Sequence, residues 1–302
     1  MKATVLVTGA GGPAGINVVK LLKRDGFRVV ATDASPYSEG FALADASYVV
    51  PPAHHPQFPE ELERVARGEG VDLVVITVDE EIEVLSSREL GEKYVMHPPH
   101  TVEVCLNKYL TYKAVEKALP EVVPEYSTSP RELSSEHVVS KPVKGRGSRG
   151  IAVGRREEFQ EREGVFFVEY LPGDEWTVDI VTSREGELLA AVPRRRLKTR
   201  AGVSVIGEVR LEERVLRYTE RLLQIMKFTG PLNIQFKESS RGELKLQEIN
   251  LRFSGALDIS AAAGVNLPSL LARSWLFGER VSFRVKEGRY VRVPEAYEWV
   301  SG

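Results

Sequence analysis

The sequence predicts an α/β fold whose C-terminal half is α+β. Up to about residue 97, strand-like and helix-like segments alternate, which is typical of a parallel sheet with helices on both faces. Beyond that point, pairs of strand-like segments joined by turns that contain Gly or Pro indicate antiparallel pairing. Because 302 residues exceed the usual size of one hydrophobic core, we expect two or three domains.

The N-terminal part predicts a repeated alternation of strands and helices. In chain order we expect strand, helix, strand, helix, strand and helix at 3–9, 13–26, 27–33, 58–70, 71–78 and 79–93. The Pro-containing stretch "YVMHPPHT" at 94–101 interrupts this pattern. We therefore predict a first domain at 1–97.

The C-terminal part predicts strands with fewer helices. We expect a helix at 105–119, two strands joined by a basic Gly-rich loop at 137–154, two strands joined by a Pro-Gly turn at 164–183, a hairpin at 231–250 and a helix at 267–278. We predict a second domain at 98–168 and a third at 169–302.

Composition excludes several classes of protein. Lys and Arg number 41 and Asp and Glu number 43, and this balance argues against a nucleic-acid partner held by phosphate neutralisation. A single cysteine, Cys105, rules out an internal disulfide and a Cys-based zinc site, and fits a reducing compartment. There is no long apolar run, so we expect no membrane span and no signal peptide, and a cytoplasmic location.

Glycines follow the first expected strand in the pattern T-G-x-x-G-x-x-G, at Gly9, Gly12 and Gly15. Asp33 ends the next strand. This arrangement is typical of a dinucleotide site, in which amides at a helix N-terminus hold a pyrophosphate and the acid binds a ribose.

Tyr109 and Lys113 form a Y-x-x-x-K pair of the kind that short-chain dehydrogenases use for proton transfer. With the glycines, this pair gives the alternative of an NAD(P)-dependent reductase. The pair lies beyond the Pro-rich boundary, however, and its spacing is frequent in ordinary amphipathic helices. The reductase interpretation also leaves the C-terminal half without a role.

Side-chain amides are concentrated in the stretch "PLNIQFKESSRGELKLQEINLRFSG". Of the ten Asn and Gln residues in the chain, this stretch contains four, namely Asn233, Gln235, Gln247 and Asn250. Such clustering indicates a local need for neutral oxygen donors.

The expected hairpin brings some of these side chains together. A four-residue turn at Ser239–Gly242 places Gln235 opposite Leu246. Leu246, Glu248 and Asn250 then share that face, with Gln235 and Glu248 as diagonal neighbours at roughly 7 to 8 Å between backbones.

One carboxylate and two amide oxygens on this face suit a hard cation. Mg²⁺ is commonly held by one or two carboxylates, with phosphate oxygens and water completing the shell. Arg252 continues the row and can brace a phosphate or acyl-phosphate oxygen. In the same register, Gln247 and Ile249 are expected on the opposite face.

A metal bound to phosphate requires a loop that holds the phosphate, and "KPVKGRGSRG" is the candidate. Lys141 ends a strand, and the loop after it combines basic residues with Gly145, Gly147 and Gly150. Glycines allow close backbone approach and expose amides to an anion. The P-loop pattern G-x-x-x-x-G-K-[ST] is absent from the sequence.

Together these segments resemble the ATP-grasp family, in particular a single synthetase half of the carbamoyl-phosphate synthetase large subunit and the stand-alone carboxylate-amine ligases. The order of elements is similar over most of the chain. The resemblance implies an ATP-grasp fold preceded by a Rossmann-like pre-ATP-grasp domain that lines the acceptor-substrate site and binds no nicotinamide.

The resemblance also implies a set of ATP-binding residues. Lys108 at a helix start reaches the phosphates, and Lys141 contacts the α- and β-phosphates. The loop that closes over the phosphates contains Gly145, Gly147, Ser148 and Gly150. The adenine and ribose contacts fall on Glu169, the backbone of Tyr170 and Leu171, and Glu175.

For the metal and the reaction, the resemblance assigns Gln235, Glu248 and Asn250 as ligands, and Arg252 with Lys141 as the catalytic residues. Asn107 and Gln235 replace acids found in many members, although a Gln at the latter position occurs in the carbamoyl-phosphate branch. Whether one or two Mg²⁺ ions bind, and whether Mn²⁺ can replace them, stays open.

Acceptor contacts are expected at two places. The N-terminal glycines, Gly11 and Gly12 among them, either hold a substrate carboxylate or only make a tight turn. The basic run "PRRRLKTRAGVS" offers Arg194, Arg196 and Arg200 to the acceptor or the γ-phosphate, with a solvated charge cluster as the alternative.

The resemblance implies an ATP-dependent ligase that phosphorylates a carboxylate and passes it to an amine or similar nucleophile. Carbamoyl-phosphate synthesis itself needs two phosphorylating halves, and this chain has one. A nucleotide-binding module without turnover is the second rival to the ligase, beside the reductase. We expect small-molecule partners, no nucleic acid and no membrane, and leave a homodimer open.

Overall fold

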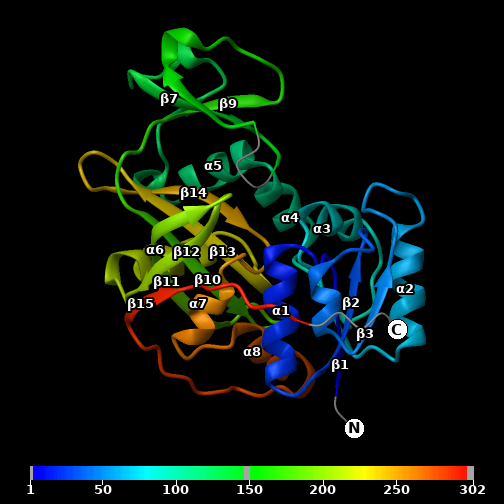
Figure 1. Ribbon diagram of the computed structural model, residues 1–302. Helices are drawn as coiled ribbons and strands as arrows, with labels where there is room; N and C mark the ends of the chain where they lie inside the picture. The colour runs from blue at the N-terminus through cyan, green and yellow to red at the C-terminus, as the bar shows by residue number, and fades with distance from the viewer. Residues whose placement is uncertain (1–2, 146–149, 298–302) are drawn as a thin grey trace.

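The computed structural model describes residues 3–145 and 150–297. Three sheets make up the molecule, and Figure 1 shows them as separate groups of strands: a parallel one, a small antiparallel one that stands above the rest, and a large antiparallel one. None of the helices in these residues is long and apolar enough to cross a membrane.

The N-terminal sheet is parallel throughout, which confirms the predicted alternation of strands and helices. Its order is β3-β2-β1-β4-β5. The strands are β1 (Thr4–Val7), β2 (Arg28–Asp33), β3 (Ala46–Val49), β4 (Leu73–Val75) and β5 (Tyr94–Val95). The helices between them are α1 (Pro13–Arg24), α2 (Phe58–Gly68) and α3 (Asp79–Ser86). All four residues of β1 are buried, as expected for a central strand covered on both faces.

The glycines after β1 have a packing reason. Gly9 has φ +57°, a conformation that glycine adopts readily. A Cβ on Gly15 would overlap the carbonyl oxygen of Gly9, and a Cβ on Gly9 would overlap the side chain of Val78. The glycine pattern therefore lets α1 begin directly against the ends of β1 and β4.

The small sheet has the order β6-β9-β7-β8 and is antiparallel. Two helices, α4 and α5, lead into it from the N-terminal sheet (Figure 1). The bounds are α4 (Pro99–Leu106), α5 (Lys108–Glu116), β6 (Tyr126–Ser127), β7 (His137–Pro142), β8 (Ala152–Arg155) and β9 (Val165–Glu169).

The helix expected at 105–119 is interrupted at its third residue. Asn107 has φ −110° and ψ 103°, and its Oδ1 accepts hydrogen bonds from the amides of Tyr109 and Leu110, both at 3.1 Å. It is thus the N-cap of α5, because an Asn side chain satisfies amides that the first turn leaves free.

The large sheet has the order β14-β13-β10-β11-β12-β15, antiparallel at every pair. Its strands are β10 (Glu175–Thr182), β11 (Leu188–Arg200), β12 (Val203–Val209), β13 (Gly230–Glu238), β14 (Leu244–Asn250) and β15 (Gly288–Val291). Its helices are α6 (Glu213–Leu223), α7 (Leu257–Ala262) and α8 (Leu267–Phe277). The described residues also contain four short 3₁₀ helices, at Glu39–Leu43, Pro120–Val122, Pro130–Glu132 and Arg156–Glu158.

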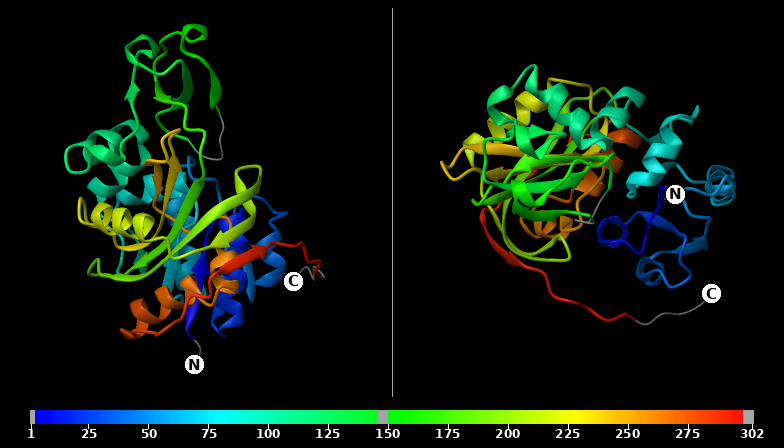
Figure 2. Two further views of the ribbon diagram at one scale, coloured as in Figure 1. Left: turned by 90° about the vertical axis from the view of Figure 1, so that its left-hand side faces the viewer. Right: turned by 90° about the horizontal axis from the view of Figure 1, so that it is seen from above.

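The parallel sheet and the large sheet are packed together. Helix α1 contacts both α7 and α8, and one buried core contains side chains from both parts of the chain. Asn17 donates to the carbonyl oxygen of Gly255 at 3.0 Å, and Asn266 donates to that of Leu21 at 3.0 Å. Figure 2 shows the small sheet rising above this base, with the long β11–β12 hairpin extending beside it.

The register predicted for the β13–β14 hairpin is wrong. Glu238 pairs with Leu244, so the loop is one residue longer than expected, and Gln235 pairs directly with Glu248 rather than with Leu246. The longer loop accounts for one residue of this shift. A β-bulge between Gln235 and Phe236 accounts for the second, because two residues of β14 oppose one of β13 there.

The bulge also changes which side chains share a face. Leu246, expected beside Glu248, is fully buried in the core, as is Ile249 beyond the bulge. Gln247, expected on the opposite face, lines the same cavity as Glu248. The convergence of Gln235 and Glu248 survives because the longer loop and the bulge each shift the pairing by one residue, and a total shift of two residues brings Glu248 directly opposite Gln235.

Candidate active site

A cavity of about 640 Å³ lies where the three sheets meet. The parallel sheet contributes the turn after β1, including Gly12 and Pro13. The small sheet contributes Lys141, and the large sheet contributes Gln235 and Glu248. A cavity of this size is within the range that holds a nucleotide-sized ligand.

Basic side chains dominate the charge on the cavity wall. Among the residues that the structure describes, three acids line it, Glu169, Glu175 and Glu248. Twice as many described cations do so, namely Lys108, Lys141, Arg194, Arg196, Lys237 and Arg252. Such an excess of positive charge in a partly enclosed space favours a polyanionic ligand.

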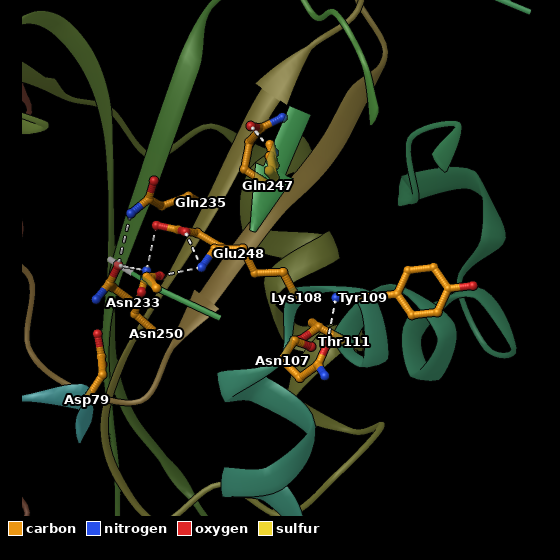
Figure 3. Close-up of polar contacts among 12 residues, drawn as sticks. Asp79, Asn107, Lys108, Tyr109, Thr111, Asn233, Gln235, Gln247, Glu248 and Asn250 are labelled. Carbon is orange, nitrogen blue, oxygen red and sulfur yellow. Dashed lines mark hydrogen bonds and ion pairs between the residues drawn. The ribbon is translucent and has the colours of Figure 1, made fainter. Parts of the chain in front are cut away.

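We call the side chains of Gln235, Glu248 and Asn250 the amide row, and the side chain of Asn233 connects its two amides. Asn233 is 1% exposed, and its Nδ2 donates to the carbonyl oxygen of Arg252 at 2.9 Å. Its Oδ1 accepts from Asn250 Nδ2 at 3.2 Å and from Gln235 Nε2 at 3.5 Å (Figure 3). Asn250 Nδ2 also donates to Glu248 Oε1 at 3.0 Å. The nitrogen atoms of both amides are engaged inside the row, so their oxygens are the atoms that can bind a ligand, although Gln235 Oε1 already accepts from Arg196 at 3.4 Å.

The oxygen atoms of this row are suitable ligands for a Mg²⁺ ion that also binds phosphate. The Glu248 carboxylate and the amide oxygens of Gln235 and Asn250 are hard ligands, but they carry one negative charge in total. Among the described residues, no group of three or more His, Cys, Asp or Glu side chains could hold a metal ion. The row therefore suits an ion that brings most of its ligands with it.

Lys108 faces this row from the start of α5. Its Nζ lies 3.8 Å from Glu248 Oε2 and donates to the carbonyl oxygen of Gly145 at 2.6 Å. Burial opposes ionisation of Glu248, but Lys108, the Asn250 hydrogen bond, Lys141 and Arg252 together lower the pKa of this carboxyl. Glu248 is thus an anion at neutral pH.

Lys141 is a buried lysine, 6% exposed, at the end of β7. Its Nζ donates to Oε1 of Gln247 at 3.2 Å. Burial lowers the pKa of Lys141 to about 8, with Glu248 acting in the opposite direction. The ammonium therefore remains charged at neutral pH.

The described part of the glycine-rich loop consists of its two ends. Gly145 and Gly150 have φ of +134° and +73°, conformations that side chains disfavour. Gly147 and Ser148, also predicted to cover the phosphates, lie outside the described residues.

The four residues predicted for adenine and ribose line the cavity between the small and large sheets. Glu169 Oε1 accepts from the amide of Glu125 at 2.8 Å, and Tyr170 is 42% exposed with the Lys237 ammonium over its ring at 5.7 Å. Leu171 is buried. Glu175, the predicted ribose ligand, is ion-paired with Arg196.

The three predicted acceptor arginines differ in position. Arg194 is 2% exposed and donates to Asp179 at 2.9 Å, with further bonds to Ser204 at 2.8 Å and Ser254 at 3.0 Å. Arg196 donates to Gly202 at 2.5 Å as well as to Glu175. Both line the cavity, whereas Arg200 is exposed at the end of β11 and does not.

Arg252 is held by a residue that the sequence did not single out. Its Nε donates to Oδ1 of Asp79 at 3.0 Å, at the start of α3. Asp79, Asn233 and Gln247 all belong to this site or its immediate surroundings. The sequence contains a signal that could have placed Gln247 in the site. The spacing between successive apolar residues lengthens from two residues to three after Leu246.

The amides of Gly11 and Gly12 are already bonded within the protein. The Gly11 amide donates to Asp33 Oδ2 at 2.8 Å, and the Gly12 amide donates to the carbonyl oxygen of Gly9 at 3.0 Å. This favours the tight turn over a carboxylate-binding role. Asp33 is likewise engaged, which weakens the comparison with a ribose-binding acid.

Tyr109 and Lys113 do not line this cavity. The ring of Tyr109 packs edge-on against Tyr126 and Phe166, at 5.5 and 5.8 Å between centroids, and the Lys113 ammonium lies 4.8 Å from its centroid. Figure 3 shows the ring pointing away from Glu248. The structure thus places the Tyr109–Lys113 pair outside the cavity that Gly9 and Gly12 line, which argues against the reductase alternative.

Two family models match the chain. Residues 161–296 match the model described as ATP-grasp in the biosynthetic pathway with Ter operon. Residues 5–95 match the model of the PylC-like N-terminal domain. A search of curated proteins found no match.

Several solved structures share the fold. An N5-carboxyaminoimidazole synthetase from Staphylococcus aureus, complexed with ADP, has a TM-score of 0.74 at 14% identity, over 97% of this chain and 83% of that one. The N5-carboxyaminoimidazole ribonucleotide synthetase from Thermotoga maritima gives 0.70 at 20% identity, over 94% and 78%. The biotin carboxylase domain of the Hydrogenobacter thermophilus 2-oxoglutarate carboxylase, solved as a dimer with MgADP and bicarbonate, gives 0.72 at 16% identity, over 96% and 73%.

Proposed function

We propose that this chain, which belongs to the ATP-grasp ligases and carries a PylC-like N-terminal domain, activates a carboxylate with ATP and transfers it to an amine or similar nucleophile. A carboxylate oxygen attacks the γ-phosphorus and ADP leaves. The nucleophile then attacks the acyl carbon of the acyl-phosphate and displaces inorganic phosphate. This reaction and that of carbamoyl-phosphate synthetase have one step in common, the phosphorylation of a carboxylate by ATP.

The observation that carries this proposal is that, among the described residues, six cationic side chains line one cavity together with Gln235 and Glu248. Asn250 lies beside them and donates to Glu248. The three arginines and Lys108 have carboxylate partners, whereas Lys141 and Lys237 have none among the described residues, so a triphosphate would supply negative charge to these two lysines above all. The same phosphates supply the ligands that a single carboxylate cannot provide to Mg²⁺. ADP in the S. aureus structure and MgADP in the H. thermophilus structure support this choice of ligand.

The residues have separate roles in this proposal. Lys108 and Lys141 neutralise phosphate oxygens, and Arg252 stabilises the charge that develops on the acyl-phosphate. Bound Mg²⁺ would supply further charge neutralisation at the phosphates, and Glu248 with the two amides would hold it. The single carboxylate of the row favours one ion over two, and Mn²⁺ is an allowed substitute because it takes the same oxygen ligands.

A screen for ADP release tests the proposal. The purified chain is incubated with ATP, Mg²⁺ and pooled carboxylic acids and amines, and ADP is measured. We expect ADP above the ATP-only background in at least one pool, and none with Glu248→Gln, which removes the only charge of the row. ATP binding without ADP in any pool would favour the nucleotide-binding module.

For quaternary structure we propose a homodimer, by analogy with the dimeric biotin carboxylase domain. Sedimentation equilibrium tests it, since a dimer has twice the 33.6 kDa mass of the chain.

A further inference from the structure

The bulge in β14 exposes two successive side chains to the cavity. In a regular strand, neighbours point to opposite faces. Here Gln247 and Glu248 both line the cavity, while Leu246 and Ile249 on either side of them are buried in the core. The residue that the bulge adds to β14 is therefore placed against the ligand space.

A tyrosine fixes this irregular backbone. Tyr112 is 0% exposed, and its hydroxyl donates to the carbonyl oxygen of Gln247 at 3.0 Å. Burial raises the pKa of Tyr112, so the hydroxyl keeps its proton. Tyr112 lies one turn after Lys108 in α5, so the helix that presents Lys108 to Glu248 also holds the bulge.

The Gln247 side chain in turn contacts Lys141. The bond from Lys141 Nζ to Gln247 Oε1, at 3.2 Å, is the one polar contact of this ammonium in the described part of the chain. No carboxylate among those residues lies within ion-pair distance of it. A neutral acceptor orients an ammonium without neutralising it, whereas a carboxylate would compete with an incoming anion.

We propose that Gln247 is a positioning residue that holds the Lys141 ammonium toward the phosphates of the nucleotide, and that Tyr112 fixes the bulge that puts Gln247 there. This inference rests on the proposed function, because it needs a phosphate-bearing ligand in the cavity. It assigns roles to two residues that the sequence did not connect with the site.

Calorimetric titration of matched variants with ATP and with adenosine tests it. Gln247→Met keeps the length of the side chain and removes the acceptor. We expect its Kd for ATP to rise about tenfold, since a hydrogen bond to a charged group contributes about 1.5 kcal/mol or more. Adenosine has no phosphate, so its Kd should stay within about twofold of wild type.

Two further variants accompany this one. Tyr112→Phe removes only the hydroxyl. We expect its Kd for ATP to rise about threefold and its Kd for adenosine to stay unchanged. Lys245→Met is the control, because Lys245 lies on the same strand but donates to Glu121 away from the cavity, and it should bind both ligands as wild type does.

An unchanged ATP Kd in Gln247→Met would overturn the inference. Equal weakening of ATP and adenosine would overturn it too, since that is the result of a merely structural role. Failure of the wild-type chain to bind ATP would overturn the proposed function, and the same titration shows this before any variant is compared.

Discussion

Arg252 is tied to Asp79 by a 3.0 Å ion pair between Nε and Oδ1, across 173 residues of sequence. Both side chains are 17% exposed. Asp79 begins α3 in the PylC-like part of the chain, and Arg252 follows β14 in the ATP-grasp part. The arginine that we assign to the acyl-phosphate is thus oriented by the other domain.

Removing this partner should affect turnover more than nucleotide binding. For Asp79→Ala we expect kcat to fall about 10- to 100-fold, from the loss of a hydrogen bond to a charged group. The Kd for ATP should change by less than about threefold, because Lys108 and Lys141 are untouched. Steady-state kinetics and calorimetry measure the two quantities. A change in ATP Kd as large as the change in kcat would show that Asp79 supports the whole cavity instead of Arg252.

ATP binding should weaken at alkaline pH through Lys141. Burial lowers the pKa of this lysine to about 8, so above pH 8 the free protein loses the charge that faces the phosphates. We expect affinity to fall by up to about tenfold per pH unit above that value. A Lys141→Met variant should bind weakly and show no such step. An affinity that is flat from pH 7 to 9.5 in the wild-type chain would contradict the role of Lys141.

The effect of Lys141 on folding has the opposite sign to its effect on ATP binding. The unfolded chain carries Lys141 with a pKa near 10.5, so between pH 8 and 10.5 it binds more protons than the folded chain. The contribution of Lys141 to stability therefore rises with pH over the range in which ATP affinity falls.

Acid should weaken the contact between the parallel and the large sheet through His97. Its Nδ1 accepts from the amide of Thr229 at 3.1 Å, and its Nε2 donates to the carbonyl oxygen of Pro231 at 3.0 Å. Burial lowers the pKa of His97 to about 4, so the unfolded chain binds more protons between pH 6.5 and 4. We expect the free energy of unfolding to fall by roughly 2 to 3 kcal/mol from this residue between pH 7 and 4.5.

The matched control is His97→Gln, which does not titrate. Urea unfolding at the two pH values should give a smaller loss of stability in the variant, by the amount stated for His97. The same loss in both proteins would show that other groups cause the acid sensitivity.

Tyr109→Phe should leave ADP formation within about threefold of wild type. Its ring packs against Tyr126 and Phe166 outside the cavity. A catalytic acid or base contributes about 10²- to 10⁴-fold, so a loss of that size would restore the reductase-type interpretation.

The alternation of strands and helices around the parallel sheet could be predicted because its signals are local. Runs such as that of β1 are buried on both faces, and glycines at the turns are needed for close packing, as Gly15 against Gly9 shows. The position of Lys141 at a strand end could be predicted for the same reason, because its signal in the sequence is also local.

The hairpin register could not be predicted from turn counting alone. The bulge changes the pairing without any Gly or Pro to mark it, and the one trace of it is the longer spacing between Leu246 and Ile249. The contact of Asp79 with Arg252 had no local signal either, since it depends on how two domains pack. The family resemblance places Asn107 where many members have an acid, whereas its position before a helical run is that of an N-cap.

The most direct test of the account is calorimetric titration of the wild-type chain with ATP in the presence and absence of Mg²⁺, and with NADH and NADPH. We expect ATP to bind, Mg²⁺ to strengthen that binding, and neither nicotinamide nucleotide to give measurable heat. In Glu248→Gln the strengthening by Mg²⁺ should disappear while ATP alone still binds. Tight binding of NADH or NADPH without binding of ATP would contradict the account.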